Sequence, residues 1–381
     1  MKKNIIRITL LLVCICFFPQ MGKADESITV GGRVRSYKLY VPAGISKPKG
    51  IIVALHGLGG TSNFFFNEYS ITDLANRKEY IVLAPQALAE QDPSVAATIS
   101  ALGSTAGIDI PLNAVWGCGM QIKIPPPLLS NLELNAGIAD EEFIREIIEK
   151  TLRDYDLPIK NIFMLGVSMG GFMTYQYAEK YPQQLAGIIA ISGSRGFLIR
   201  GTSNVPLPVL DFHSDQDEIV PYSGSWQVNQ LGITSVAMAY GKNEVINYWV
   251  NRNGANTTPK EENVNYYASL KNIKVTKYTY AQLSKGNEVI HYKMTSSTKG
   301  VPAHDYLFSS AKGDCMDYVV EVEKFITAHA DKNGNGIINI SATPANIVGY
   351  YSIWGIKLPK APEKGIYIIK YDNGKSEKIL K

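Results

Sequence analysis

The residues with the clearest chemical potential lie in GVSMGG, residues 166 to 171. Ser168 has a glycine two positions before it and another two positions after it. A serine on a sharp turn from a strand into a helix needs small residues at both positions, because larger side chains would collide with neighbouring backbone. That geometry presents the serine hydroxyl as a nucleophile. Short patterns of this kind also occur by chance, so a base, an acid and an oxyanion site must be found elsewhere.

The acid is expected directly after a strand, because functional groups in open α/β sheets gather at the carboxyl ends of the strands. The apolar run 207–214 is followed by DQDEIVP, which offers Asp215 and Asp217, and Asp211 lies inside the run. Asp217 is favoured because it lies in the loop past the strand end. The alternatives are a strand role for Asp211 and a turn-capping role for Asp215.

The base is expected last in the chain order Ser, Asp, His. His56 and His213 come too early in the chain. His329 ends an amphipathic helix, where the helix dipole explains a histidine, and His291 lies in an alternating strand pattern. His304 follows that strand on a loop and is therefore the predicted base.

The oxyanion site is expected in the glycine-rich turn HGLGG, residues 56 to 60. The backbone N–H of Leu58 is the first predicted donor, and the N–H of Met169, directly after the nucleophile, is the second. A tight turn without a catalytic role is the alternative. With these donors, the serine, aspartate and histidine predict acyl transfer through an acyl-serine intermediate.

Short apolar runs alternate with segments of helical spacing, which predicts an α/β fold with a mostly parallel central sheet flanked by helices. Residues 28–42 predict an antiparallel hairpin that turns at Gly31 and Gly32. The predicted strands cover 50–56, 80–85, 161–167, 185–192, 207–214 and 272–280. The predicted helices cover 62–78, 139–156, 172–182, 242–254 and 314–330.

The composition excludes several classes of protein. The chain has 381 residues, of which 45% are hydrophobic and 19% charged, so it can form one large domain and a small one. The formal net charge of +4 and the absence of a basic cluster with interleaved aromatics argue against a nucleic-acid partner. DKNGNG (331–336) resembles the start of a calcium loop, but Ala342 stands where a bidentate glutamate is required. No zinc spacing occurs, so neither a metal nor a cofactor is predicted.

The termini predict an exported protein. The N-terminus has a basic start, an apolar stretch too short for a comfortable membrane span, and small residues at a cleavage position, so no stable membrane insertion is expected. A polar stretch rich in Gly, Asn and Pro separates the last predicted helix from a short β-rich end. The predicted organisation is a signal peptide (1–24), a catalytic domain (25–330), a linker (331–345) and a C-terminal β segment (346–381).

Removal of the signal peptide leaves two cysteines, Cys118 and Cys315. An exported chain meets an oxidising compartment, so these residues are a candidate disulfide. Two buried free thiols are the alternative, because the sequence does not place their Cα atoms within bonding reach.

Over about residues 27 to 328 the chain resembles the secreted esterases grouped with poly(3-hydroxybutyrate) depolymerases, feruloyl esterases and acetylxylan esterases. The resemblance rests on VALHGLGGTSNFF, NIFMLGVSMGGFMTYQYAEKYP, VLDFHSDQDEIVPY and GVPAHDYLF. It implies an α/β-hydrolase fold and the triad Ser168, Asp217 and His304. The chain departs from the family at Ala255, where members often have cysteine, and after the base histidine, where they have Trp-Pro.

The resemblance also suggests a substrate-binding surface, and the C-terminus resembles a secretion signal. Residues 113–137 stand where the family places part of its substrate surface, so Trp116 is expected to stack on a sugar or aromatic acid, with packing on the core as the alternative. The C-terminal GIYIIK and GKSEKILK resemble the sorting domain of type IX secretion, which implies contact with export machinery and a secreted or cell-surface protein. A β appendage that stabilises the catalytic domain or binds carbohydrate is the alternative.

Four functions follow from these features. The first is a serine ester hydrolase that removes feruloyl or acetyl groups from plant cell-wall polysaccharide, its expected partner. A polyester depolymerase would use the same triad. A serine peptidase on the same fold is a third hypothesis, although the chain has no spare length for a large gating domain. A surface binding protein without activity is the fourth.

Overall fold

The computed structural model describes most of the chain between Lys23 and Leu380. The chain divides into two compact units, Met1–Gly334 and Asn335–Lys381, and each is described by itself. The described residues are 23–106, 109–126, 130–157, 161–201, 203–230, 233–264, 273–281, 287–299, 304, 316–330, 347–352, 357–362, 366–371 and 376–380. The predicted signal peptide therefore lies almost wholly outside them.

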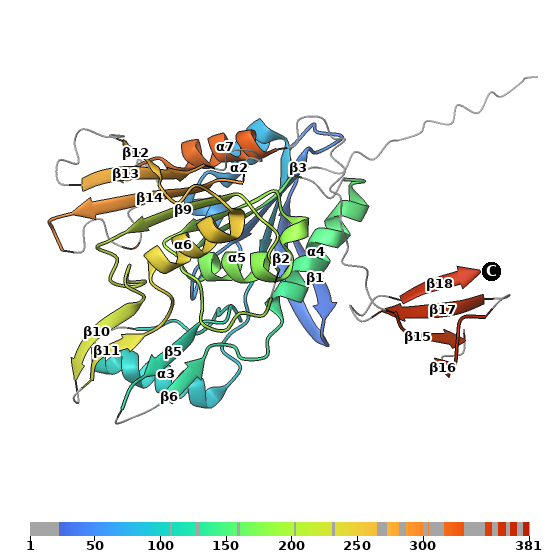
Figure 1. Ribbon diagram of the computed structural model, residues 1–381, viewed down its shortest axis with the longest axis horizontal. Helices are drawn as coiled ribbons and strands as arrows, with labels where there is room; N and C mark the ends of the chain where they lie inside the picture. Colours follow the sequence, from blue (N-terminus) through green and yellow to red (C-terminus); the bar gives the residue numbers. More distant parts are fainter. Residues whose placement is uncertain are drawn as a thin grey trace, which may run out of the picture. The chain divides into compact units, whose positions relative to one another are not determined.

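A ten-stranded sheet forms the centre of the first unit (Figure 1). Its strands, in spatial order, are β1 (Lys23–Val30), β2 (Arg33–Tyr40), β4 (Tyr80–Pro85), β3 (Gly50–Leu55), β7 (Ile162–Val167), β8 (Gly187–Ile191), β9 (Val209–Ser214), β14 (Val289–Ser296), β13 (Ile273–Tyr280) and β12 (Lys260–Asn263).

The six strands from β4 to β14 in this order run parallel, and antiparallel strands form both edges. β1 and β2 form the predicted hairpin, with Val30 opposite Arg33 and positive φ at Gly31 and Gly32. Positive φ at both turn residues is what a two-residue hairpin turn requires. The predicted parallel centre and antiparallel edge are confirmed.

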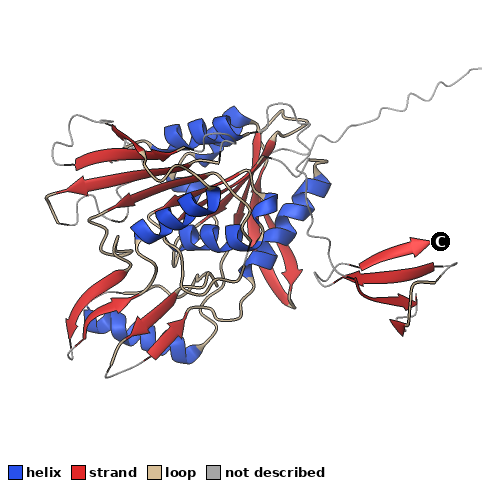
Figure 2. Ribbon diagram, in the orientation of Figure 1, coloured by secondary structure: helices blue, strands red, loops and turns tan. Residues whose placement is uncertain are grey.

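Helices cover both faces of this sheet (Figure 2). Alternate residues of β3 divide between two cores, because successive side chains of a strand point to opposite faces. Ile51, Val53 and Leu55 join one core, and Ile52 and Ala54 join the other. The first core contains side chains of α4 (Asp140–Asp154), α5 (Met169–Lys180) and α6 (Lys242–Asn253), and the second contains side chains of α1 (Phe64–Glu68), α2 (Ile71–Lys78) and α7 (Tyr318–His329).

A second sheet and one helix were not predicted. The sheet has the order β10 (Ser225–Gln230), β11 (Ile233–Ala237), β5 (Gln121–Ile124), β6 (Ser130–Glu133), and the helix is α3 (Pro93–Ala106). These strands have four to six residues, too few for a clear alternation, and β11 pairs with the distant strand β5, with Ala237 opposite Lys123. A short 3-10 turn, Pro182–Gln184, follows α5.

The second unit is a four-stranded antiparallel sheet. Its spatial order is β16 (Lys357–Leu358), β15 (Ile347–Ser352), β17 (Ile366–Tyr371), β18 (Ser376–Leu380). The sequence predicted a short β-rich end here. The division between the units falls within the predicted linker 331–345.

The sheet order, its helices and the sharp turn after β7 are those of an α/β-hydrolase fold. In such folds the loops at the carboxyl ends of the parallel strands form the site. Those ends are where GVSMGG, DQDEIVP and HGLGG lie.

Candidate active site

Ser168 lies on the sharp turn between β7 and α5. Its backbone has φ 54° and ψ −123°, a conformation that an L-residue rarely adopts. The flanking glycines are required by contact: a Cβ on Gly166 would lie 2.1 Å from the Gly170 carbonyl oxygen, and a Cβ on Gly170 would lie 2.1 Å from the Leu55 oxygen. The backbone at Ser168 is therefore strained, as it is in a turn that projects a nucleophile, and both predicted glycine positions require glycine.

The turn of residues 56–60 runs beside this serine. A Cβ added to Gly57 would lie 3.2 Å from Ser168 Cβ and 3.7 Å from its Oγ. Within the part of the chain that the structure describes, neither the Leu58 nor the Met169 N–H donates a backbone hydrogen bond. Met169 is the first residue of α5, where N–H groups have no partner within the helix. Both N–H groups therefore stay candidate donors for the predicted oxyanion site.

A buried histidine fixes the turn. The Nδ1–H of His56 donates to the Gly57 oxygen over 2.7 Å, so its Nε2 is unprotonated and accepts the Ala87 N–H over 3.2 Å. Burial lowers the pKa of His56 to about 4, despite the hydrogen bond to Gly57. A neutral imidazole with both nitrogens engaged is structural, which agrees with its exclusion as the base.

Trp116 is wrongly predicted as a substrate-stacking residue. Its side chain is fully buried, its ring centroid lies 5.0 Å from that of His56, and its Nε1–H donates to the His56 oxygen over 2.8 Å. A ring with no exposed surface cannot stack on a ligand. The alternative, packing on the core, is correct, and the indole also holds the start of the 56–60 turn.

We expect Trp116→Phe to lower the free energy of unfolding by about 1–2 kcal/mol, because it leaves the buried His56 oxygen without its donor. Urea unfolding measures this change. The KM for any ester that the chain hydrolyses should stay unchanged, since the buried ring has no surface for a ligand. A raised KM with unaltered stability would restore the stacking role.

Asp217 and His304 are brought together by the loop after β9. His304 Nδ1 lies 2.7 Å from Asp217 Oδ2. The other carboxylate oxygen, Oδ1, accepts the N–H groups of Ile219 (2.9 Å) and Val220 (2.8 Å). The Asp217 side chain has no exposed surface, whereas 18% of the His304 side chain is exposed. The aspartate is therefore held rigidly, and the histidine can meet a substrate.

The charge state of Asp217 follows from these contacts. Burial by itself raises the pKa of its carboxyl, but the hydrogen bond and charge of His304, the charge of His213 and the Val220 N–H together lower the pKa below its ordinary value. An ionised carboxylate only accepts hydrogen bonds, so Nδ1 of His304 carries the proton. Its Nε2 then has the free lone pair of a general base.

Ser192, which directly follows β8, links the segments that carry Ser168 and His304. Its hydroxyl donates to the His304 carbonyl oxygen over 3.0 Å, and the preceding Ile191 accepts the Ser168 N–H over 2.8 Å. Ser168 and His304 are therefore both anchored to consecutive residues of one strand end. Ser192 was not predicted, although it follows a buried strand as the other site residues do.

His213 is a second residue that the sequence did not single out. Its Nε2–H donates to the Val220 oxygen over 2.8 Å, and Nε2 lies 3.5 Å from Asp217 Oδ2. Burial and the nearby charge of Lys242 lower the pKa of His213 to about 4, although Asp217 and Asp211 act in the opposite direction. His213 is therefore a neutral side chain, and its hydrogen bond to Val220 holds the loop that carries Asp217.

The buried histidines predict acid-sensitive stability. His56 and His213 have pKa values of about 4 in the folded protein and about 6.5 when unfolded, so the unfolded chain binds more protons between these pH values. The free energy of unfolding should therefore fall as the pH falls from 6.5 to 4, by up to roughly 3 kcal/mol for each histidine. Urea unfolding at several pH values measures this slope. Constant stability over that range would contradict buried, neutral histidines.

The other aspartates and histidines have different surroundings. Asp211 is buried and contacts Lys242 and His291, each at 2.7 Å, so its carboxylate is engaged away from His304. Asp215 is half-buried, and its side chain lies 3.9 Å from Lys293. His329, at the end of α7, lies 3.1 Å from Glu288.

Cys118 is a free, fully buried thiol, so the candidate disulfide with Cys315 is not formed in this structure. Burial raises the pKa of the Cys118 thiol to about 12, which keeps it protonated and unreactive. Cys315 lies outside the described residues. The alternative of a buried free thiol is correct for Cys118.

The described residues hold neither a metal cluster nor a membrane-spanning helix. No group of three His, Cys, Asp or Glu side chains there could hold a metal ion, and DKNGNG lies outside those residues. No helix in the described ranges is long and apolar enough to cross a membrane.

Comparison with known proteins gives one family and several relatives. Residues 132–245 match the model of the phospholipase/carboxylesterase family. This range contains Ser168 and Asp217 but ends before His304.

The chain is similar to several esterases. It is 20% identical, over 83% of its length, to a bifunctional acetylxylan esterase/xylanase of Neocallimastix patriciarum and covers 37% of that protein. It is 23% identical to a probable acetylxylan esterase A of Aspergillus flavus, in an alignment that covers 49% of this chain and 52% of that protein. It is 24% identical to feruloyl esterase B of Neurospora crassa, in an alignment that covers 42% of this chain and 44% of that protein. The chain thus spans about half or less of these relatives.

A solved structure, the acetyl xylan esterase from Aspergillus awamori, aligns with a TM-score of 0.46 and 16% identity. The alignment covers 79% of this chain and 99% of that one.

Proposed function

We propose that this chain is a serine carboxylic ester hydrolase with Ser168 as nucleophile, His304 as base and Asp217 as the acid that orients the base. The observation that carries the proposal is the Asp217–His304 hydrogen bond of 2.7 Å at the carboxyl end of the sheet that also presents the strained Ser168.

The reaction follows from the proton positions. His304 Nε2 takes the Ser168 proton as Oγ attacks the ester carbonyl, and the Leu58 and Met169 N–H groups stabilise the resulting oxyanion. The tetrahedral intermediate expels the alcohol, which receives the proton from His304. Water, deprotonated by the same nitrogen, then attacks the acyl-serine and releases the acid.

The substrate class we propose is an acetyl or feruloyl ester on plant cell-wall polysaccharide. The named activities of the similar esterases support this choice. A polyester such as poly(3-hydroxybutyrate) is the second candidate, because the same triad serves any accessible carboxylic ester.

We also propose that the protein acts outside the cytoplasm. Support comes from the sequence of residues 1–24 and from the C-terminal strands, which would address the chain to export machinery. Cleavage after Ala24 removes the first two residues of β1 and leaves the rest of the hairpin.

A substrate panel tests the proposal. The purified chain is offered acetylated xylan, methyl ferulate, hydroxybutyrate oligomers and a chromogenic peptide. We expect turnover of the xylan or ferulate ester and none of the peptide. Turnover of the hydroxybutyrate oligomers alone would support the second candidate, turnover of the peptide alone would make the chain a peptidase, and binding of xylan without any hydrolysis would make it a binding protein.

A further inference from the structure

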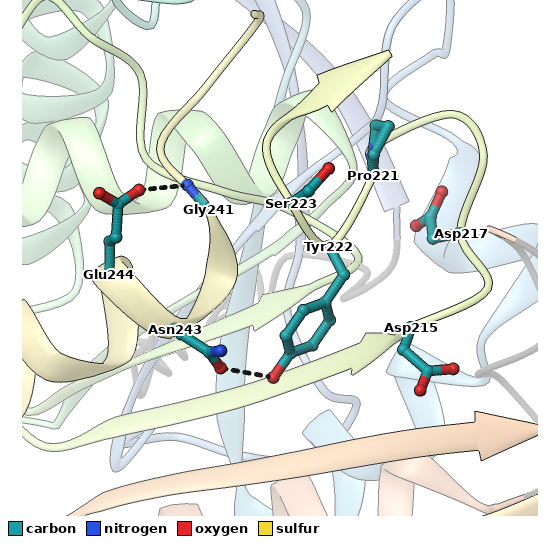
Figure 3. Close-up of a pocket in the computed structure, with 8 residues that line it drawn as sticks. All are labelled: Asp215, Asp217, Pro221, Tyr222, Ser223, Gly241, Asn243 and Glu244. Atoms are coloured by element: carbon teal, nitrogen blue, oxygen red, sulfur yellow. Dashed lines mark hydrogen bonds between the residues drawn. The ribbon is translucent and has the colours of Figure 1, made fainter. Parts of the chain in front are cut away.

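Two adjoining cavities lie beside the loop that carries Asp217. The larger, of about 570 Å³, is lined by Asp217, Tyr222 and Asn243, among others (Figure 3). The smaller, of about 330 Å³, shares Tyr222 and Asn243 and extends over Tyr278 and Tyr280. The groove thus begins at the acid of the proposed triad and continues between α6 and the sheet.

The floor of this groove is a row of side chains across three strands. Asp211 of β9 is paired with His291 of β14, which is paired with Tyr278 of β13, so the three side chains point to the same face. The Tyr278 ring stacks on His291, with centroids 6.1 Å apart and planes at 21°. Tyr280, two residues further, lies on the same face.

A buried ion pair between Lys242 and Asp211 determines which atoms in this row carry protons. Lys242 Nζ lies 2.7 Å from Asp211 Oδ1. Burial raises the pKa of Asp211, but the charge of Lys242, the hydrogen bond and charge of His291 and the charge of His213 together lower it below its ordinary value. His291 Nδ1 lies 2.7 Å from the ionised Asp211 Oδ2 and must donate to it. His291 Nε2 is therefore an acceptor.

The hydroxyl oxygen of Tyr222 can therefore accept a hydrogen bond from a ligand in the groove. Its hydroxyl lies 2.9 Å from His291 Nε2, and the single phenolic proton is donated there. Asn243 Oδ1 lies 3.2 Å from the same oxygen and is the other acceptor within its reach. One lone pair of the Tyr222 oxygen is left for a hydroxyl group of a ligand.

The remaining wall suits a neutral, hydroxylated ring. Tyr278 and Tyr280 are half-buried and offer flat apolar faces with polar tips. The rim carries Glu244 and Asp215 as well as Lys293, so the charges are mixed and do not form the cationic cluster that a phosphate requires. Asn243 and Asn247 supply amide donors and acceptors.

We propose that this groove binds an unesterified pyranose unit of the polysaccharide whose ester Ser168 cleaves, with the ring against Tyr278 and Tyr280 and one hydroxyl donating to Tyr222. The proposal rests on the proposed function. The groove would contact the polysaccharide at a sugar unit, separately from the acyl group that Ser168 attacks.

Binding of unsubstituted xylotetraose to the full-length Ser168→Ala protein tests this site by calorimetry. Tyr278→Ala and Tyr280→Ala should each weaken binding several-fold, their combination at least tenfold, and the milder Tyr222→Phe several-fold. The matched control is Thr279→Ala, whose side chain points to the other face of the same strand, and it should leave the Kd unchanged. No binding by the parent, or equal Kd values in all variants, would overturn the site.

Kinetics separate this site from the proposed function. In the active protein, the tyrosine variants should lose kcat/KM on acetylated xylan and keep the turnover of p-nitrophenyl acetate within twofold. Loss of turnover on both esters would place the tyrosines in the structure of the active site and overturn the proposal. Xylotetraose binding without any ester hydrolysis would refute the proposed function and leave the sugar site standing.

Discussion

Ser168→Ala should reduce ester turnover on the order of 10⁵–10⁶-fold, because no acyl-enzyme can form without the nucleophile. The fold should be retained, since alanine is compatible with the small volume available on the turn. Turnover of p-nitrophenyl acetate, with circular dichroism to show folding, measures both effects.

The matched control is Ser194→Ala, which removes a nearby hydroxyl that donates to the Tyr240 oxygen over 2.7 Å. This variant should keep activity within about tenfold, since one neutral hydrogen bond contributes about 1 kcal/mol. Activity of Ser168→Ala within tenfold of the parent would remove Ser168 from the mechanism.

Asp217→Asn should reduce kcat on the order of 10⁴-fold. The two N–H donors at Oδ1, from Ile219 and Val220, require the amide oxygen of the new side chain at that position. The NH₂ group is therefore forced toward His304 Nδ1, which must become an acceptor. The imidazole proton then moves to Nε2, and the base can no longer take a proton from Ser168.

Asp215→Asn is the control for this change, because Asp215 lies two residues away in the same loop and is half-buried. It should leave kcat within a few-fold of the parent. Equal losses in the two variants would mean that the loop as a whole, and not the His304 tautomer, governs activity.

The sequence was most informative where one local rule fixes a residue. Glycines 166 and 170 are required by contacts of 2.1 Å, so the pattern around Ser168 reported a real steric need. The parallel strands were recognisable because both faces are buried, which makes each run apolar throughout. The loop position past a strand end selected Asp217 and the chain order selected His304, and the structure places these two residues in contact.

The features that were missed depend on contacts between distant segments. β5, β6, β10 and β11 form one sheet from short strands that have no strong pattern of their own. Lys242 looks like an ordinary helix-start lysine, yet its amine is buried against Asp211, 31 positions earlier. Trp116 and Cys118 have residue types suited to a ligand or a disulfide. The burial of the Trp116 ring and the free thiol of Cys118 show that they serve neither role in this structure.

Covalent labelling tests the central claim most directly. The purified chain is treated with an organophosphonate ester that phosphonylates activated serines, and the labelled peptide is identified by mass spectrometry. We expect one adduct, on Ser168, that forms in parallel with the loss of ester turnover and does not form in Asp217→Asn at a comparable rate. An adduct on another residue, or full turnover in a chain labelled at Ser168, would contradict the account.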